Sequence, residues 1–417
     1  MEDAHAGLVA RPTEDPVASC GSCHPNITEH AVDSLHFTLR GYDTAIYARS
    51  APEHFPALEE METYHCNDCH ASCGDCHVSQ PNSVGGGLVQ GHVFYREPSM
   101  SQNCTACHGS RVKDEYYGAH EGIPSDVHFR ARMACIDCHT GDVMHGVNVE
   151  ADHRYDGTRE PTCEDCHTAQ VGAGSGILQH EIHGTESLSC QACHSVEYTN
   201  CTNCHVQRTE DDIPFFSVES HSLGFYLGRN PLRSAERPYE YVPLRHVPID
   251  PDSFSFYGEN LLPNFSALPT WVHATPHNIQ RNTPQTESCL SCHGNDAIFL
   301  TPDKVEPNVL EANLGVIVPA APPLPEGYED VITRPEAATP ASEGGGDDFW
   351  GGEGESSAPA TESEPAAPAA EGDSFWGGDG ESEGSAAPAS DATSGTDASS
   401  PTPEATPAED AESFWGN

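Results

Sequence analysis

The stretch YHCNDCHASCGDCHVSQ, residues 64–80, places four cysteines and three histidines within 17 positions. It contains two copies of one unit, in which two cysteines stand two residues apart and a histidine follows at once. The unit occurs nine times and takes all 18 cysteines of the 417-residue chain. The cysteines are Cys20, Cys23, Cys66, Cys69, Cys73, Cys76, Cys104, Cys107, Cys135, Cys138, Cys163, Cys166, Cys190, Cys193, Cys201, Cys204, Cys289 and Cys292. The histidines are His24, His70, His77, His108, His139, His167, His194, His205 and His293.

A CxxCH unit is the attachment sequence for c-type haem. One turn of helix brings both thiols under the two vinyl groups of the porphyrin, and the histidine that follows reaches the iron. The sequence therefore predicts nine covalently bound c-type haems, with one histidine ligand each.

Three other uses of CxxC pairs fit less well. Zinc ribbons and iron–sulfur sites do not require a histidine after every pair. A disulfide framework would place its cysteines at varied spacings rather than repeat a two-residue gap nine times.

The motifs resemble those of multihaem c-type cytochromes over residues 20–293. Within this range, SDVHFRARMACIDCHTGDVMHG (125–146) is similar to a repeat of periplasmic multihaem cytochromes. In that repeat, a histidine seven residues before the first cysteine supplies the second iron ligand. His128 stands at this position before Cys135, and His183 before Cys190.

Nine irons would each need a second ligand. The chain has sixteen histidines outside the motifs and only five methionines, so mostly bis-histidine ligation is expected. The first candidates are His128, His145 and His183, and the others are His36, His65, His92, His120, His153, His221, His273 and His277. Eleven candidates exceed nine places, so at least two are in error. His5, His30, His54, His180 and His246 are left out.

The composition predicts an unusual fold. Hydrophobic residues make up 36% of the chain, below the roughly 45–50% of globular proteins, so porphyrins would supply much of the interior. We expect a mainly coil protein with short α-helices, a haem core and little β structure. The predicted parts are a loose N-terminal segment (1–19), a nonahaem cytochrome domain (20–320) and a disordered acidic tail rich in Pro, Ala, Ser and Gly (321–417).

The tail repeats a motif of its own. DDFWGG (347–352), DSFWGG (373–378) and ESFWGN (412–417) hold three of the four tryptophans. They are interpreted either as a multivalent tether that docks on a partner or as low-complexity filler.

Charge and hydropathy limit the partners. A net charge of −47 with 18 basic residues excludes nucleic acid, and no apolar run is long enough to span a membrane. Cationic or metal-bearing surfaces remain plausible partners. Because haem is attached outside the cytoplasm, a periplasmic, extracellular or cell-surface location and a removed signal peptide are expected; MEDAHAGLVARPTEDP is not such a signal.

The favoured function is an electron conduit between a periplasmic or membrane donor and an extracytoplasmic, extracellular or mineral acceptor. One alternative is an oxidoreductase of small nitrogen or sulfur compounds with an open haem, similar to hydroxylamine oxidoreductases and octahaem tetrathionate reductases. Another is a homo-oligomer or subunit of an extracellular cytochrome filament. Short spacings predict that the haems of His70 and His77, and those of His194 and His205, are neighbours.

Overall fold

The computed structural model describes residues 12–38, 40–67, 71–91, 93–147, 151–155 and 161–328. The chain divides into two units, Met1–Glu343 and Gly344–Asn417, and all described residues belong to the first. The predicted tail beyond residue 328, with its three Phe-Trp-Gly motifs, lies outside the described residues, as do residues 1–11 of the N-terminal segment. Backbone contacts of the first unit extend past the predicted boundary at residue 320, since Gly294 N–H donates to the carbonyl oxygen of Pro322 at 2.9 Å.

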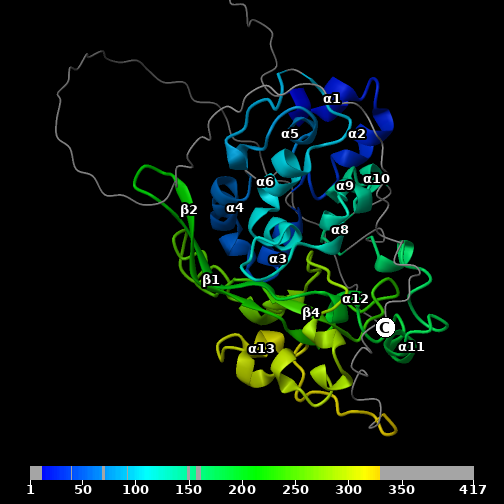
Figure 1. The fold of residues 1–417 in the computed structure, drawn as a ribbon. Helices are drawn as coiled ribbons and strands as arrows, with labels where there is room; N and C mark the ends of the chain where they lie inside the picture. The colour runs from blue at the N-terminus through cyan, green and yellow to red at the C-terminus, as the bar shows by residue number, and fades with distance from the viewer. Residues whose placement is uncertain are drawn as a thin grey trace, which may run out of the picture. The chain divides into compact units, whose positions relative to one another are not determined.

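The helices are short (Figure 1). In the described part of the chain the longest is α4, Phe55–His65, with 11 residues. The other α-helices are α1 (Pro16–Cys20), α2 (Pro25–Ala31), α3 (Arg40–Tyr47), α5 (Cys73–His77), α6 (Thr105–Cys107), α7 (Asp114–Tyr117), α8 (Val127–Arg130), α9 (Cys135–Cys138), α10 (Gly141–Met144), α11 (Leu178–His183), α12 (Cys190–His194) and α13 (Leu310–Asn313). None of the helices that the structure describes combines the length and apolar character needed to cross a membrane.

Within the described residues, five strands form two antiparallel sheets. Strands β1 (Tyr198–Arg208) and β2 (Pro214–Gly224) pair as a hairpin, which extends at the left of Figure 1. Strands β3 (Leu227–Arg229), β4 (Tyr241–His246) and β5 (Trp271–His273) follow one another in a three-stranded sheet.

The 11-residue strands of the hairpin differ from the little β structure predicted from the sequence. Tyr, Thr and Val in β1, and Phe and Val alternating with polar residues in β2, are residue types that favour extended backbone. The eighth CxxCH motif therefore lies on a strand and not in a helical turn.

A conventional hydrophobic core joins the later part of the first unit, from Val206 to Ile317, with Ile46, Leu58 and Met61 of its early part. Val242 and Leu244 of β4 pack with Leu300 and Val316, and all four are at most 1% exposed. Side chains therefore build part of the interior.

The stretch 62–150, which holds four of the nine motifs, is built differently. In its described part no Ala, Val, Leu, Ile, Met, Phe, Tyr or Trp is buried. The chain folds there with hardly any apolar interior of its own, as expected if large apolar groups complete the packing.

Candidate functional site

Six motif histidines each face one histidine from outside the motifs. The distances between ring centroids are 6.0–6.4 Å in all six pairs. The pairs, with the motif member first, are His108–His36, His77–His145, His167–His128, His139–His277, His194–His180 and His293–His183.

The spacing fits one metal ion between the two rings. Metal–imidazole nitrogen bonds of about 2 Å on opposite sides of an ion would place the ring centroids roughly 6 to 6.5 Å apart. The interplanar angles vary from 17° to 73° while the distance stays nearly constant. Ligation to a shared ion constrains the separation of two rings but leaves their relative rotation free. The donor set therefore fits bis-histidine haem iron.

Hydrogen bonds orient several of these rings. In five of the paired histidines, Nδ1 donates a hydrogen bond to the backbone carbonyl oxygen of another residue. The acceptors are Tyr95 for His77 (2.6 Å), Gln179 for His183 (2.9 Å), Gln280 for His194 (3.1 Å), Pro323 for His293 (3.0 Å) and Gln170 for His180. Such a bond occupies Nδ1 and leaves Nε2 as the nitrogen available to a metal.

Burial favours the neutral form of six of the paired histidines. Neutral imidazole is the form that binds a metal. Burial, followed by the effect of neighbouring histidines, lowers the pKa of both His36 and His277 to about 4. Burial also lowers the pKa of His108, His145, His183 and His194. His128 differs, because a hydrogen bond with Asp126 raises its pKa.

The motifs themselves fold as single helical turns at several positions. The histidine N–H donates to the carbonyl oxygen of the first cysteine at 2.8–3.0 Å in the motifs of Cys20, Cys104, Cys135, Cys163 and Cys289. Such a turn was expected because it brings both thiols to one side.

In three motifs an aspartate caps the N-terminal end of the helical turn. Asp75, Asp137 and Asp165 each stand just before the second cysteine. Their carboxylates accept the backbone N–H of the residue that precedes the first cysteine, at 2.7, 2.6 and 2.9 Å. The CxDCH form of these motifs therefore caps its own turn.

Cysteines of different motifs also lie close together. Cys135 lowers the pKa of Cys104 and Cys104 raises that of Cys135, and Cys163 and Cys190 affect each other in the same way, with the pKa of Cys163 lowered and that of Cys190 raised. Burial raises the pKa of four further thiols, and the next cause in each case is a cysteine of another motif. These pairs are Cys73 with Cys20, Cys76 with Cys104, Cys138 with Cys166, and Cys292 with Cys193.

These electrostatic neighbours link seven motifs in a row. Numbered along the chain, the motifs are linked in the order one, three, four, five, six, seven and nine. The predicted neighbourhood of haems two and three, and that of haems seven and eight, stay predictions. Part of the second motif, Cys69 and His70, lies outside the described residues.

The eighth motif lies on the hairpin. Cys201 of β1 is directly opposite His221 of β2, a predicted ligand. His205 donates Nδ1 to the carbonyl oxygen of Asp252 at 3.2 Å. His246, which the sequence analysis left out, is buried and donates Nδ1 to the carbonyl oxygen of Cys201 at 2.7 Å. Strand β2 thus brings His221 to this motif, and the end of β4 brings His246.

Three predicted ligands have other neighbours. Nε2 of His65 lies 2.8 Å from the hydroxyl of Tyr257, and Nε2 of His120 lies 3.3 Å from that of Thr199. His273 is 3% exposed and stacks on Tyr155, with ring centroids 5.5 Å apart.

Of the remaining predicted ligands, His153 is described by the structure and His92 is not. His153 contacts Tyr155, with ring centroids 5.6 Å apart. His92 lies outside the described residues. His180 was omitted from the candidates, yet the structure places it opposite His194.

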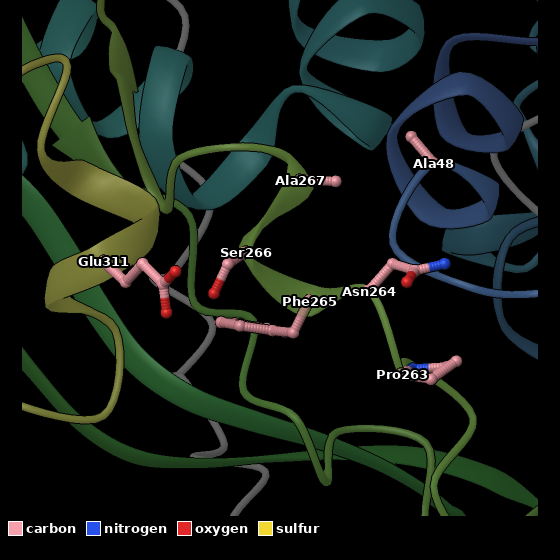
Figure 2. Close-up of a pocket in the computed structure, with 7 residues that line it drawn as sticks. All are labelled: Ala48, Pro263, Asn264, Phe265, Ser266, Ala267 and Glu311. Carbon is pink, nitrogen blue, oxygen red and sulfur yellow. The ribbon is translucent and has the colours of Figure 1, made fainter.

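Two cavities formed by described residues differ in what lines them. One of about 560 Å³ lies between α13 and the loop 263–267, with Ala48 across from them (Figure 2). Glu311 is the one acidic side chain among its lining residues, which include no cysteine or histidine. A second cavity, of about 330 Å³, is lined by Gly172, Ala173 and residues 181–187, which include His183 of the pair His293–His183. The second cavity adjoins the paired histidines, whereas the first shares no residue with them.

Two further observations concern other uses of the same residues. No disulfide joins the 17 cysteines that the structure describes. No group of three or more His, Cys, Asp or Glu side chains gathers around a common metal position within the described residues.

Comparisons with protein-family models, with curated proteins and with solved structures give no match to this chain.

Proposed function

We propose that this chain is an electron-transfer protein that carries nine covalently attached c-type haems, mostly with two histidine ligands each. Bound haem would supply one-electron redox chemistry at each site. The observation that carries the proposal is the set of six motif histidines, each facing a second histidine at 6.0–6.4 Å.

The chain's own residues would hold and orient the cofactors. The cysteines would form the thioether bonds, and each histidine pair would bind one iron from both sides. Backbone carbonyl oxygens would fix the rings of five paired histidines, such as His77 and His293, through Nδ1. Two histidines on one iron leave no position for a substrate, which favours electron transfer over catalysis.

The neighbourhood of the motifs supports a conduit. Pairs in which one cysteine shifts the pKa of another link seven of the nine motifs in a row, from Cys20 to Cys292. Electrons would enter from a periplasmic or membrane donor and leave to an acceptor outside the cytoplasm. A periplasmic or extracellular location, and docking of the tail motifs on a partner, belong to the same proposal.

Electron paramagnetic resonance of the natively produced, oxidised protein at low temperature tests the proposal. We expect low-spin ferric signals to dominate, because most irons would have two strong nitrogen ligands. A high-spin signal that nitrite or hydroxylamine perturbs would instead indicate an open iron and an oxidoreductase.

A further inference from the structure

The buried carboxylate of Asp126 lies close to residues of three proposed haem sites. Asp126 precedes α8 and is 1% exposed. Its Oδ1 accepts the backbone N–H groups of His128 at 2.6 Å and of Phe129 at 3.3 Å. This is the ordinary capping role of an aspartate at a helix N-terminus.

The same oxygen also meets the ring of His128. Nδ1 of His128 lies 3.1 Å from Oδ1, so the other ring nitrogen is the one left for the iron shared with His167. Five other paired histidines donate Nδ1 to backbone carbonyl oxygens, which are neutral. A carboxylate attracts the Nδ1 proton more strongly and makes the imidazole a more basic ligand.

The second oxygen of Asp126 holds a different segment. Oδ2 accepts the backbone N–H of Ile279 at 2.6 Å, and the carbonyl oxygen of Ile279 accepts Val127 N–H at 3.1 Å. His277, two residues earlier, is the partner of His139. Asp126 therefore connects the fifth proposed haem site to the sixth.

The segment continues to the seventh site. Gln280 follows Ile279, and its carbonyl oxygen accepts Nδ1 of His194 at 3.1 Å. The side-chain amide of Gln280 donates to the carbonyl oxygen of Ser125 at 2.9 Å, next to Asp126. The short run 277–280 thus passes three histidine pairs and is fastened to Asp126 in the middle.

A capping role alone would not require both oxygens. Asparagine or serine can cap a helix with one acceptor. Here Oδ1 faces N–H groups of His128 and Phe129, while Oδ2 faces a further N–H donor, that of Ile279. Only a carboxylate supplies acceptors on both sides.

We propose that Asp126 is a positioning residue for the sixth haem, and that its carboxylate lowers the reduction potential of the iron held by His128 and His167. A more basic ligand and a nearby negative charge both favour the ferric state. The inference rests on the proposed function, because it requires the haems to be present.

The test is a potentiometric titration of the full chain, followed by haem absorbance, for the unmodified protein and for Asp126→Asn and Asp126→Ser. Both variants keep a capping acceptor and remove the charge. We expect one of the haem components to move to higher potential in both, while the others stay in place. Asp126→Glu, which retains a carboxylate, should keep that component near its original position.

Asp303→Asn serves as the matched control, because Asp303 is an exposed residue in the turn Pro302–Lys304. It should leave the component unchanged. The inference is overturned if Asp126→Asn and Asp126→Ser keep all haems and titrate like the unmodified protein, or if every component shifts together. Absence of haem from the unmodified protein would instead overturn the proposed function itself, so the two failures are distinguishable.

Discussion

The six histidine pairs fall into two groups by the angle between their ring planes. Three pairs are near parallel, at 17°, 24° and 26°. The other three are steeply crossed, at 64°, 69° and 73°. For two ligands on one iron, this angle decides how strongly they split the iron d orbitals with which they overlap.

The angles predict two families of low-spin signals in the oxidised protein. Parallel rings act on the same d orbital and separate it from its partner, whereas crossed rings leave the two nearly equal in energy. We expect at least three haems with strongly anisotropic signals and at least three with ordinary rhombic signals in electron paramagnetic resonance. A single family of signals would contradict the pairing.

Replacing His180 tests a ligand that the sequence did not identify. His180 faces His194 with 6.0 Å between ring centroids, so His180→Ala should leave one iron with a single histidine. We expect one haem to become high-spin, as measured by magnetic resonance and absorbance. His54→Ala is the control, since His54 belongs to none of the six pairs. Unchanged low-spin signals in His180→Ala would exclude this assignment.

The motifs and their spacing in the sequence identified the motif histidines and several of the histidines that face them. They did not identify which histidine pairs with which motif. His128 and His183 were selected because each stands seven residues before a motif cysteine. In the structure His183 faces His293, more than a hundred residues away. Such pairs depend on how distant segments pack, and no local spacing encodes that. His180 has no repeat around it and was missed for the same reason.

At the scale of elements, helix α7 and the loop after it support Asp126. Gly118 ends the helix in the left-handed region, with φ of 69°, and lies against the backbone of Ser125. A Cβ at this position would meet the backbone nitrogen of Ser125 and would stand 2.6 Å from its Cα. Only glycine fits here without displacing the loop.

Gly118→Ala is therefore expected to destabilise the fold by about 1–3 kcal/mol, because it combines backbone strain with a steric clash. Denaturant unfolding followed by circular dichroism measures the change. Gly122→Ala is the control, since Gly122 also has a positive φ, 78°, but a Cβ there meets nothing within 4 Å. An equal loss of stability in both variants would show that strain alone, without the Ser125 contact, sets the cost.

Element type was predictable where the motif itself dictates it. A CxDCH motif carries its own capping aspartate, and Cys73–His77 forms a helix as expected. The motif at Cys201 became part of a strand because its neighbours pair with β2. Tertiary pairing of Phe-, Val- and Thr-rich segments overrode the local turn there.

At the scale of the whole chain, the stretch 62–150 and the later hydrophobic core differ in what fills them. Low hydrophobic content in the sequence predicted a thin core. The structure has such a stretch, but it also has the cluster around Val242 and Leu244, which the average composition of the chain concealed. Composition describes the chain as a whole and cannot locate a core within it.

The acidic tail leads to a prediction at the same scale. Deleting residues 329–417 removes all three Phe-Trp-Gly motifs and none of the cysteines or histidines. We expect the haem spectrum to stay unchanged and the protein to be released from its docking partner, as followed by cell fractionation. Unchanged localisation of the truncated chain would eliminate the tether.

The central claim is that every CxxCH motif carries a covalently bound haem. The most direct measurement is the ratio of haem to polypeptide in natively produced protein, from the alkaline pyridine haemochrome spectrum and quantitative amino-acid analysis. We predict nine haems per chain, one for each motif, retained after denaturation. A colourless protein, or one with far fewer than nine haems, would contradict the account.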